Sequence, residues 1–321
     1  MDDHPAETAV AEKRSSLFVE LLKRLLREKP LGTFGGIIIL TFMLVSLLAP
    51  TLAPFPYTEI HLIDRLQGSS STYLLGTDQL GRDFMSRLIY GARHSALVSF
   101  SATTLSLLVS LLLGGVAGFV GGKFDLGVQR FVDAWMSFPG LLLLLTVMSI
   151  VGQGVLQIIV VLGISYGIGN SRIVRSAVIG IKGNDYFLAA KALGTPLNQI
   201  LFRHVLPNIM PPLIIIFSIN IGSVIMSEAA LSFLGFGLPP EVPSWGGMLS
   251  REGRQYMEMA PRLALWPGLC LVSVVYGVNM FGDAMRDLLD PRLKGGQGSY
   301  GTAKVKHKRG FLTRLLNPFN G

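Results

Sequence analysis

The stretch LGTFGGIIILTFMLVSLLAPTL, residues 31–52, decides the structural class of this protein, because it contains no charged side chain. An α-helix rises about 1.5 Å per residue, so roughly 20 apolar residues cross a bilayer core of about 30 Å. The stretch follows a polar leader of 30 residues. It is also longer than the apolar region of a signal peptide, which has about 7–15 residues. It therefore predicts a first transmembrane helix and not a cleaved signal.

Five further apolar runs follow the first one. They cover residues 96–120, 132–151, 155–173, 209–231 and 263–281. Pro139 lies inside the third predicted span and should kink or start that helix. Only 15% of all residues are charged, against about 25% in a typical soluble domain. We therefore expect an all-α integral membrane protein with six transmembrane helices, which form one domain over residues 31–293.

The basic residues indicate how the helices are oriented. With a cytoplasmic N-terminus, 21 of the 28 lysines and arginines fall on the inner side and seven on the outer side. Because inner loops of membrane proteins are enriched in Lys and Arg, this distribution predicts that both ends of the chain are cytoplasmic. The net charge of +8 then follows from membrane topology, and it does not indicate nucleic-acid binding.

The two terminal segments differ from the membrane domain. In the leader, residues 1–30, leucines recur at helical spacing between Lys23, Arg24, Arg27 and Lys29. This pattern is typical of an amphipathic helix that lies in the inner membrane interface, and a helix packed on a partner protein fits it equally well. The tail, residues 294–321, is rich in Gly and Lys, and we expect a flexible basic linker with a weak membrane-surface segment.

The inner loop between the fourth and fifth spans, about residues 174–208, has a distinct pattern. Residues 186–193 favour a helix, Gly194 and Pro196 break it, and residues 198–205 resume helical spacing. A short helix, a glycine turn and a second short helix result. Such an element suits a groove on another protein, but it would also suit packing against its own helical bundle. The residues alone leave both interpretations open.

This loop resembles the conserved EAA loop of ABC-importer permeases, whose pattern is E-A-A, three residues, G, nine residues, I-x-L-P. Matching residues stand at the family's spacing: Ala189, Ala190, Gly194, Leu206 and Pro207. Leu188 replaces the glutamate and His204 replaces the isoleucine. The ending with Arg203, His204, Leu206 and Pro207 is similar to the dipeptide, oligopeptide and nickel branch. The resemblance implies that these seven residues contact an ATPase subunit, although without the salt bridge that the glutamate would make.

The outer loop between the first two spans contains LGTDQLGRDFMSRLIYGAR, residues 75–93. Asp78, Arg82 and Asp83 form a candidate ion-pair cluster over the mouth of a cavity. From chemistry alone we favour a solvated turn, since exposed ion pairs contribute only about 0–1 kcal/mol. The GTD-x-x-GRD-x-x-SR pattern resembles a signature of the same permease branch, and this resemblance shifts the preference from a solvated turn to a functional cluster. It marks Gly76, Thr77, Asp78, Gly81, Arg82 and Asp83.

The loop between the last two spans begins at Ser227 and supplies candidates for an outer gate. Glu228 ends an apolar helix, where a carboxylate usually faces the bundle interior or water. Trp245 suits the membrane interface. Asn220, in the fifth span, and Ser227 are candidates for the transport pathway, although helix–helix hydrogen bonding is the more frequent role of such residues. This segment and GDAMRDLLDPRL, residues 282–293, also resemble the branch.

The sequence contains no G-x-x-x-x-G-K-[ST] phosphate loop and no motif for catalysis or metal binding. We therefore expect a non-enzymatic subunit without a cofactor of its own. The resemblance implies a second permease, two ATPase subunits that bind ATP and Mg²⁺, and an extracytoplasmic solute-binding protein. It also implies alternating access in the inner membrane of a prokaryote. A stand-alone ion-coupled transporter or channel and a membrane enzyme are the rivals. The branch carries dipeptides, longer peptides, nickel chelates and related small solutes, and of these we expect short peptides.

Overall fold

The computed structural model describes residues 17–289, with side chains from residue 22 onward, and it is helical almost throughout this range. The predicted tail and residues 1–16 of the predicted leader lie outside it. The elements are α1 (Leu17–Glu28), α2 (Pro30–Leu47), α3 (Ala49–Leu52), η1 (Leu62–Asp64), α4 (Phe84–Ser110), η2 (Leu111–Gly115), α5 (Val116–Val120), α6 (Gly122–Met136), α7 (Gly140–Val151), α8 (Val155–Lys182), α9 (Asp185–Ala192), α10 (Leu197–Gln199), η3 (Ile200–Val205), α11 (Leu206–Phe233), α12 (Trp245–Met248), η4 (Leu249–Gly253) and α13 (Arg262–Leu289).

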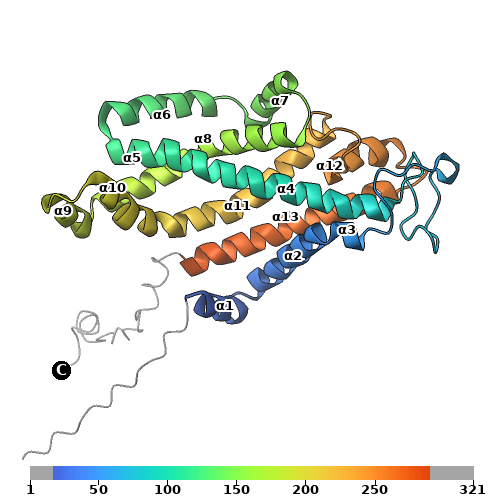
Figure 1. Cartoon of the computed structure of the whole chain (residues 1–321), viewed down its shortest axis with the longest axis horizontal. Coiled ribbons are helices and arrows are strands. Elements are labelled where there is room, and N and C mark those ends of the chain that lie inside the picture. The colour runs from blue at the N-terminus through green and yellow to red at the C-terminus, as the bar shows by residue number, and fades with distance from the viewer. Residues whose placement is uncertain (1–16, 290–321) are drawn as a thin grey trace, which may run out of the picture. The chain divides into compact units, whose positions relative to one another are not determined.

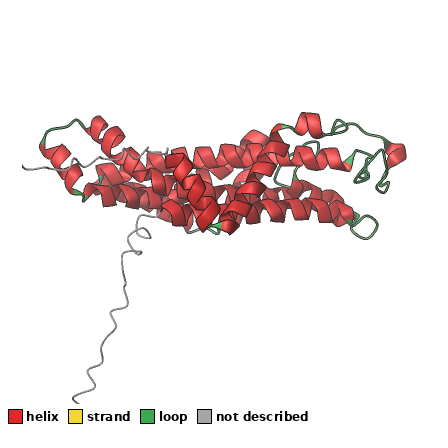
Figure 2. Cartoon of the chain, turned by 90° about the horizontal axis from the view of Figure 1, so that it is seen from below, coloured by secondary structure: helices red, strands yellow, loops and turns green. Residues whose placement is uncertain are grey.

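Five helical segments in the described range are long and apolar enough to cross a membrane. They are Pro30–Leu47, Phe84–Val120, Val155–Lys182, Leu197–Phe233 and Arg262–Leu289. The pair α6 and α7 makes a sixth span only if the two helices are counted together. Figure 1 shows these helices along the chain, and Figure 2 shows that helices and loops account for the described residues. The all-helical fold class is therefore confirmed, with five or six spans.

The third predicted span is a bent pair of helices, α6 and α7. α6 and α7 are bent by 89° at residues 137–139. Pro139 lacks a backbone N–H and disfavours helical geometry at the residue before it, so α6 ends at Met136. Alone, α7 has 12 residues and a length of about 18 Å, which is too short for the apolar core. Of the two effects expected of Pro139, a kink or a helix start, the structure shows the second, since α7 starts directly after it.

Two spans extend well beyond their predicted limits. The second begins at Phe84 and not near residue 96, and the fifth begins at Leu197 and not near residue 209. Each has 37 residues, or about 55 Å of helix, which exceeds the apolar core. The extra turns of α4 reach the outer loop, and those before α11 reach the inner loop. The inner loop itself is correspondingly shorter than predicted, since α8 continues to Lys182.

Glycines allow the spans to approach one another closely. A Cβ atom on Gly114 would overlap the carbonyl oxygen of Ser171, which brings η2 against α8. A Cβ on Gly277 would lie 2.7 Å from the Ile38 side chain, where α13 packs on α2. Small residues at such contacts are the usual means of packing helices in lipid, where apolar side chains gain little from leaving the solvent.

The described part of the leader helix α1 packs on the C-terminal end of α13. Leu25 is buried with Ala284 and Leu288, and Lys29 Nζ lies 2.5 Å from Asp287 Oδ2. Leu22 and Leu26 stay exposed. The predicted amphipathic helix is therefore present. Its placement in the membrane interface remains a prediction.

Candidate functional site

The outer-loop motif folds into a turn that only glycine can make at two positions. Gly76 and Gly81 have φ angles of 78° and 73°, in the left-handed region. A Cβ at Gly76 or Gly81 would also overlap the carbonyl oxygen of Gln67 or His61, respectively. The turn aims the side chain of Asp78 inward, where its Oδ1 accepts the backbone N–H groups of Leu80 and Arg82 at 2.8 and 3.0 Å.

Four buried charges meet behind this turn, and we call Asp78, Arg82, Arg87 and Glu252 the outer clasp. Arg82 Nε donates to Asp78 Oδ2 at 2.6 Å, and Arg87 Nε lies 3.3 Å from the same oxygen. The Nη2 atoms of Arg82 and Arg87 lie 3.4 and 3.3 Å from Glu252 Oε1. All four side chains are at most 8% exposed. The clasp therefore joins the outer loop and the start of α4 to η4.

Asp78 and Arg82 form an ion pair as the cluster interpretation expected, and the pair is buried, unlike the solvated turn that chemistry alone favoured. Within the described residues Asp83 pairs with no arginine; its Oδ2 accepts from Ser86 N at 2.7 Å and from Ser86 Oγ at 2.6 Å, which caps α4. Thr77 is also buried, and its hydroxyl donates to the carbonyl of Asp64.

The sequence interpretation did not single out Arg87 and Glu252 as members of the cluster. Arg87 is the last residue of the quoted pattern, so a signal for it exists. Glu252 stands 165 residues from Arg87, and no local pattern links the two residues.

Further contacts hold the outer loop to the start of α13. Arg262 Nη2 donates to the carbonyl oxygens of Leu66 and Gln67 at 3.1 and 2.6 Å. Tyr73 donates to Asp64 Oδ2 at 3.1 Å, and burial together with this bond to a carboxylate raises the pKa of Tyr73. The loop is therefore an ordered cap and not a loose connection.

The outer end of α11 carries the predicted gate residues in a buried setting. Glu228 is 1% exposed, its Oε1 accepts from Ser232 Oγ at 2.8 Å, and Ser95 Oγ of α4 lies 3.5 Å from its Oε2. Trp245 is buried as well, and its Nε1 donates to the carbonyl of Leu88 at 3.0 Å. The indole ring of Trp245 thus fixes α12 against α4, and its level relative to the membrane interface stays a prediction.

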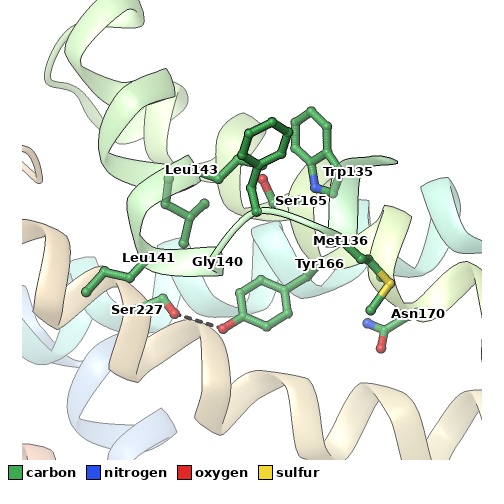
Figure 3. A pocket seen from close by; sticks show the side chains of 12 residues that line it. Trp135, Met136, Gly140, Leu141, Leu143, Ser165, Tyr166, Asn170 and Ser227 are labelled. Atoms are coloured by element: carbon green, nitrogen blue, oxygen red, sulfur yellow. Dashed lines mark hydrogen bonds between the residues drawn. The ribbon is translucent and has the colours of Figure 1, made fainter. Parts of the chain in front are cut away.

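A pocket of about 470 Å³ opens beside the break between α6 and α7. We call it the neutral pocket, because no charged side chain lines it. Its lining includes Trp135, Leu141, Ser165, Tyr166, Asn170 and Ser227. Figure 3 shows the Tyr166 ring from α8 pointing toward Ser227 of α11, with their oxygens 2.8 Å apart. Asn220 lies about two turns from Ser227 on α11 and does not line the pocket.

The inner loop forms an elbow, residues 185–199, that has one packed face and one exposed face. Gly194, with a φ angle of 72°, makes the turn between α9 and α10. Phe187 and Ala190 are buried in one apolar cluster with Val178 of α8. The opposite face leaves Leu188, Leu193 and Leu197 exposed, with Leu193 at 86%. Large exposed apolar side chains that lie together often mark an interaction site.

The other predicted residues of this loop differ in burial. Ala189, Arg203 and Pro207 are exposed, and His204 and Leu206 are half-buried. Both interpretations of the loop therefore describe part of the elbow: one face packs on the chain's own bundle, and the other is open to a partner.

Two acidic residues of α6 bind arginines of α8 near the inner end. Arg175 Nε and Nη2 donate to Asp125 at 2.5 and 2.6 Å, which is a bidentate geometry. Asp133 accepts from Arg172 and also lies 3.8 Å from Arg130. These ion pairs fix the broken helix beside α8 and thereby shape one wall of the neutral pocket.

A comparison with family models assigns this architecture. Residues 110–295, more than half of the chain, match the model described as "Binding-protein-dependent transport system inner membrane component". The chain belongs to this family. Residues 16–68 of the permease also match the "N-terminal TM domain of oligopeptide transport permease C". The resemblance seen in the three loops is thus confirmed, as is a multi-pass protein of the inner membrane.

Two curated relatives cover most of the permease. It is 39% identical to the "Dipeptide transport system permease protein DppC" of Alkalihalophilus pseudofirmus, over 86% of this chain and 90% of the relative. It is 33% identical to the "Oligopeptide transport system permease protein OppC" of Bacillus subtilis, over 89% and 93%.

A solved structure shares the fold. It is a chain of the MetNI methionine ABC transporter in an inward-facing form, with a TM-score of 0.53 and 21% identity, over 64% of this permease and 97% of that chain.

Proposed function

We propose that this permease carries short peptides into the cytoplasm as one subunit of an ABC importer, with both of its termini on the cytoplasmic side. The names of the relatives, dipeptide and oligopeptide permeases, support the substrate class. The neutral pocket supports it too, since hydroxyl and amide groups on an apolar wall suit the uncharged backbone of a peptide. A stand-alone ion-coupled transporter is not favoured, because the family works with a binding protein.

The observation that carries the proposal is the exposed apolar face of the elbow. Leu188, Leu193 and Leu197 surround the Gly194 turn, and Phe202 adds a further exposed ring one turn on. Exposure of these apolar side chains to water is unfavourable, and an ATPase subunit would bury them. Because η3 joins the elbow directly to α11, a push on this face moves the helix that carries Ser227 and Glu228.

The mechanism that follows is alternating access. Partner ATPases bind ATP and Mg²⁺ and close, and their movement displaces the elbow. The displacement rocks α11 against α8, which reshapes the neutral pocket between these helices. Peptide enters from a solute-binding protein on the outer side and leaves to the cytoplasm. In this scheme the permease has no catalytic residue and supplies a changing shape.

Co-purification and transport test the proposal. Leu193→Glu should reduce the amount of ATPase that co-purifies with the permease and should abolish ATP-dependent uptake of a labelled dipeptide by proteoliposomes. Ile63→Glu is the matched control, because Ile63 is 97% exposed in the outer loop. It should leave ATPase co-purification unchanged. Uptake without any ATPase, or normal coupling in the Leu193 variant, would overturn the proposed role of the elbow.

A further inference from the structure

A second concave surface shares no lining residue with the neutral pocket. It has a volume of about 690 Å³ and is formed by the outer ends of α2 and α4 with the loop after α3. We call it the outer groove, and its principal residues are Met43, Leu47, Tyr57, Tyr90, Arg93 and Leu97. None of these residues lines the neutral pocket, so the two sites are separate.

Arg93 is the feature of the groove that requires an explanation. It is exposed, and it has no hydrogen bond or ion pair with any residue of the described range. The outer arginines Arg82 and Arg87 are instead buried and paired in the clasp. Arg93 stands just before the uncharged run of residues 96–120, which begins in α4, so we expect its guanidinium near the level where the apolar core gives way to the headgroups.

Aromatic rings form the wall of the groove at the level of Arg93. The rings of Tyr57 and Tyr90 are 4.6 Å apart, and His94 meets Tyr57 edge-on with centroids 6.0 Å apart. His94 Nδ1 lies 3.1 Å from the Pro243 carbonyl oxygen, which can only accept, so the imidazole is held in place as a donor. Tyrosines are enriched at headgroup level because their rings are apolar and their hydroxyls are polar.

The other half of the groove is apolar. Met43 and Leu47 come from the last two turns of α2, and Leu97 comes from the first apolar turn of α4. All three side chains are exposed, with Leu47 at 71%. The groove therefore presents a cation and phenol groups at one end and an exposed aliphatic wall at the other, in the order that a lipid presents its phosphate and its acyl chain.

We propose that the outer groove binds one membrane phospholipid. Its phosphate lies on the Arg93 guanidinium beside the Tyr57 and Tyr90 hydroxyls, and one acyl chain follows Met43, Leu47 and Leu97. A helix of a partner protein would place apolar side chains over Arg93 and would need its own carboxylate there. A phosphodiester supplies that negative charge without further components, and arginine binds phosphate oxygens in a bidentate geometry.

Native mass spectrometry of the detergent-purified transporter, titrated with phosphatidylglycerol, tests the site. A basic residue near the membrane surface contributes about 1 kcal/mol to anionic lipid binding, which corresponds to roughly fivefold in affinity. Arg93→Gln should lose one retained lipid and weaken its binding about fivefold, whereas Arg93→Lys, which keeps the charge but not the bidentate geometry, should bind with an affinity between those of Arg93→Gln and the wild type. Arg254→Gln removes another exposed outer arginine and is the matched control, with no expected change.

Two further measurements distinguish a bound lipid from free phosphate and from a partner subunit. Millimolar inorganic phosphate should not displace the lipid, because it lacks the acyl chain, and Leu97→Gln should weaken lipid binding independently of Arg93. Equal lipid retention in wild type and Arg93→Gln would overturn the proposal. So would an equal loss in Arg254→Gln, displacement by phosphate alone, or a crosslink from a residue 97 probe to another subunit in the lipid-loaded complex.

Discussion

Removing the Glu252 carboxylate from the outer clasp should destabilise the protein far more than removing an exposed charge. In Glu252→Ala, the guanidinium groups of Arg82 and Arg87 lose the oxygen that lies 3.4 and 3.3 Å from them. Gln79, which donates to the same oxygen at 3.3 Å, loses its partner too. Two arginines then share the single carboxylate of Asp78, which leaves one uncompensated positive charge in a buried site.

The magnitude follows from the geometry. At an effective dielectric constant of about 20, a pair of unit charges roughly 3.3 Å apart attracts by about 5 kcal/mol. Desolvation of the charges offsets much of this gain, and breaking a buried pair by removing one partner typically costs about 3–5 kcal/mol. We therefore expect a loss of about 3–5 kcal/mol in the free energy of unfolding for Glu252→Ala. Glu252→Gln should cost less than Ala, since it keeps an acceptor oxygen.

Arg65→Ala is the comparison for an exposed cation. Arg65 Nη2 donates to the Tyr256 hydroxyl at 3.1 Å, and its guanidinium lies 5.7 Å from the centre of the Tyr256 ring. Such an exposed contact contributes about 0.5–1 kcal/mol. The double variant Arg87→Met with Glu252→Leu should also lose much less than Glu252→Ala, because it removes both charges and leaves Asp78 paired with Arg82.

Reversible unfolding in mixed micelles, followed by circular dichroism, gives the free energies for all four variants. The temperature at which the half-buried Cys270 reacts with a thiol dye ranks the stability of the variants independently. The reasoning is refuted if Glu252→Ala costs no more than Arg65→Ala, since the clasp would then be hydrated. It is also refuted if the double variant is less stable than the single one.

Glycine substitutions test the turn and the helix contacts. Gly81→Ala combines a positive φ angle with an overlap on the His61 carbonyl, and it should cost about 2 kcal/mol or more in unfolding free energy, whereas Gly68→Ala, with open space around it, should be neutral. Gly114→Ala pushes η2 away from α8 and should lower the free energy of unfolding by about 1–3 kcal/mol. Its control is Gly169→Ala, which has open space around it like Gly68 and should be neutral or stabilising by up to about 1 kcal/mol. Unfolding in micelles measures both pairs, and equal effects within a pair would show that the close contacts are absent.

The spans could be predicted from hydropathy, but their ends could not. An apolar run locates the part of a helix that lies in lipid. In the sequence, the first charged residue marks the end of that run. The helix itself continues as long as the backbone is hydrogen-bonded, so α4 extends back to Phe84 through Arg93 and Arg87. The cap at Asp83 was available as a signal, since aspartate is favoured at the residue before a helix.

The candidate sites show the limit of local patterns. Gly81 and Asp78 stand in one short motif, so their turn could be proposed from sequence. The solvated turn was favoured because most exposed ion pairs contribute little, and the sequence did not show that the turn is buried. Tyr166 and Ser227 are 61 residues apart, as Arg87 and Glu252 are 165 apart. Only tertiary packing creates such pairs, and no periodicity encodes them.

The two ends of the fifth span explain why its length matters for the proposed mechanism. From Leu197 to Ser227 the helix runs about 45 Å, from the elbow to the wall of the neutral pocket. Pro211 and Pro212 interrupt its hydrogen bonding near the middle of this length, in the second turn of α11, which permits a bend there. Beyond them, Glu228 is fixed to α4 through Ser95. A push on the elbow therefore meets a helix that can bend near Pro212 and is held at its outer end, so the inner side of the pocket is the part that must move first.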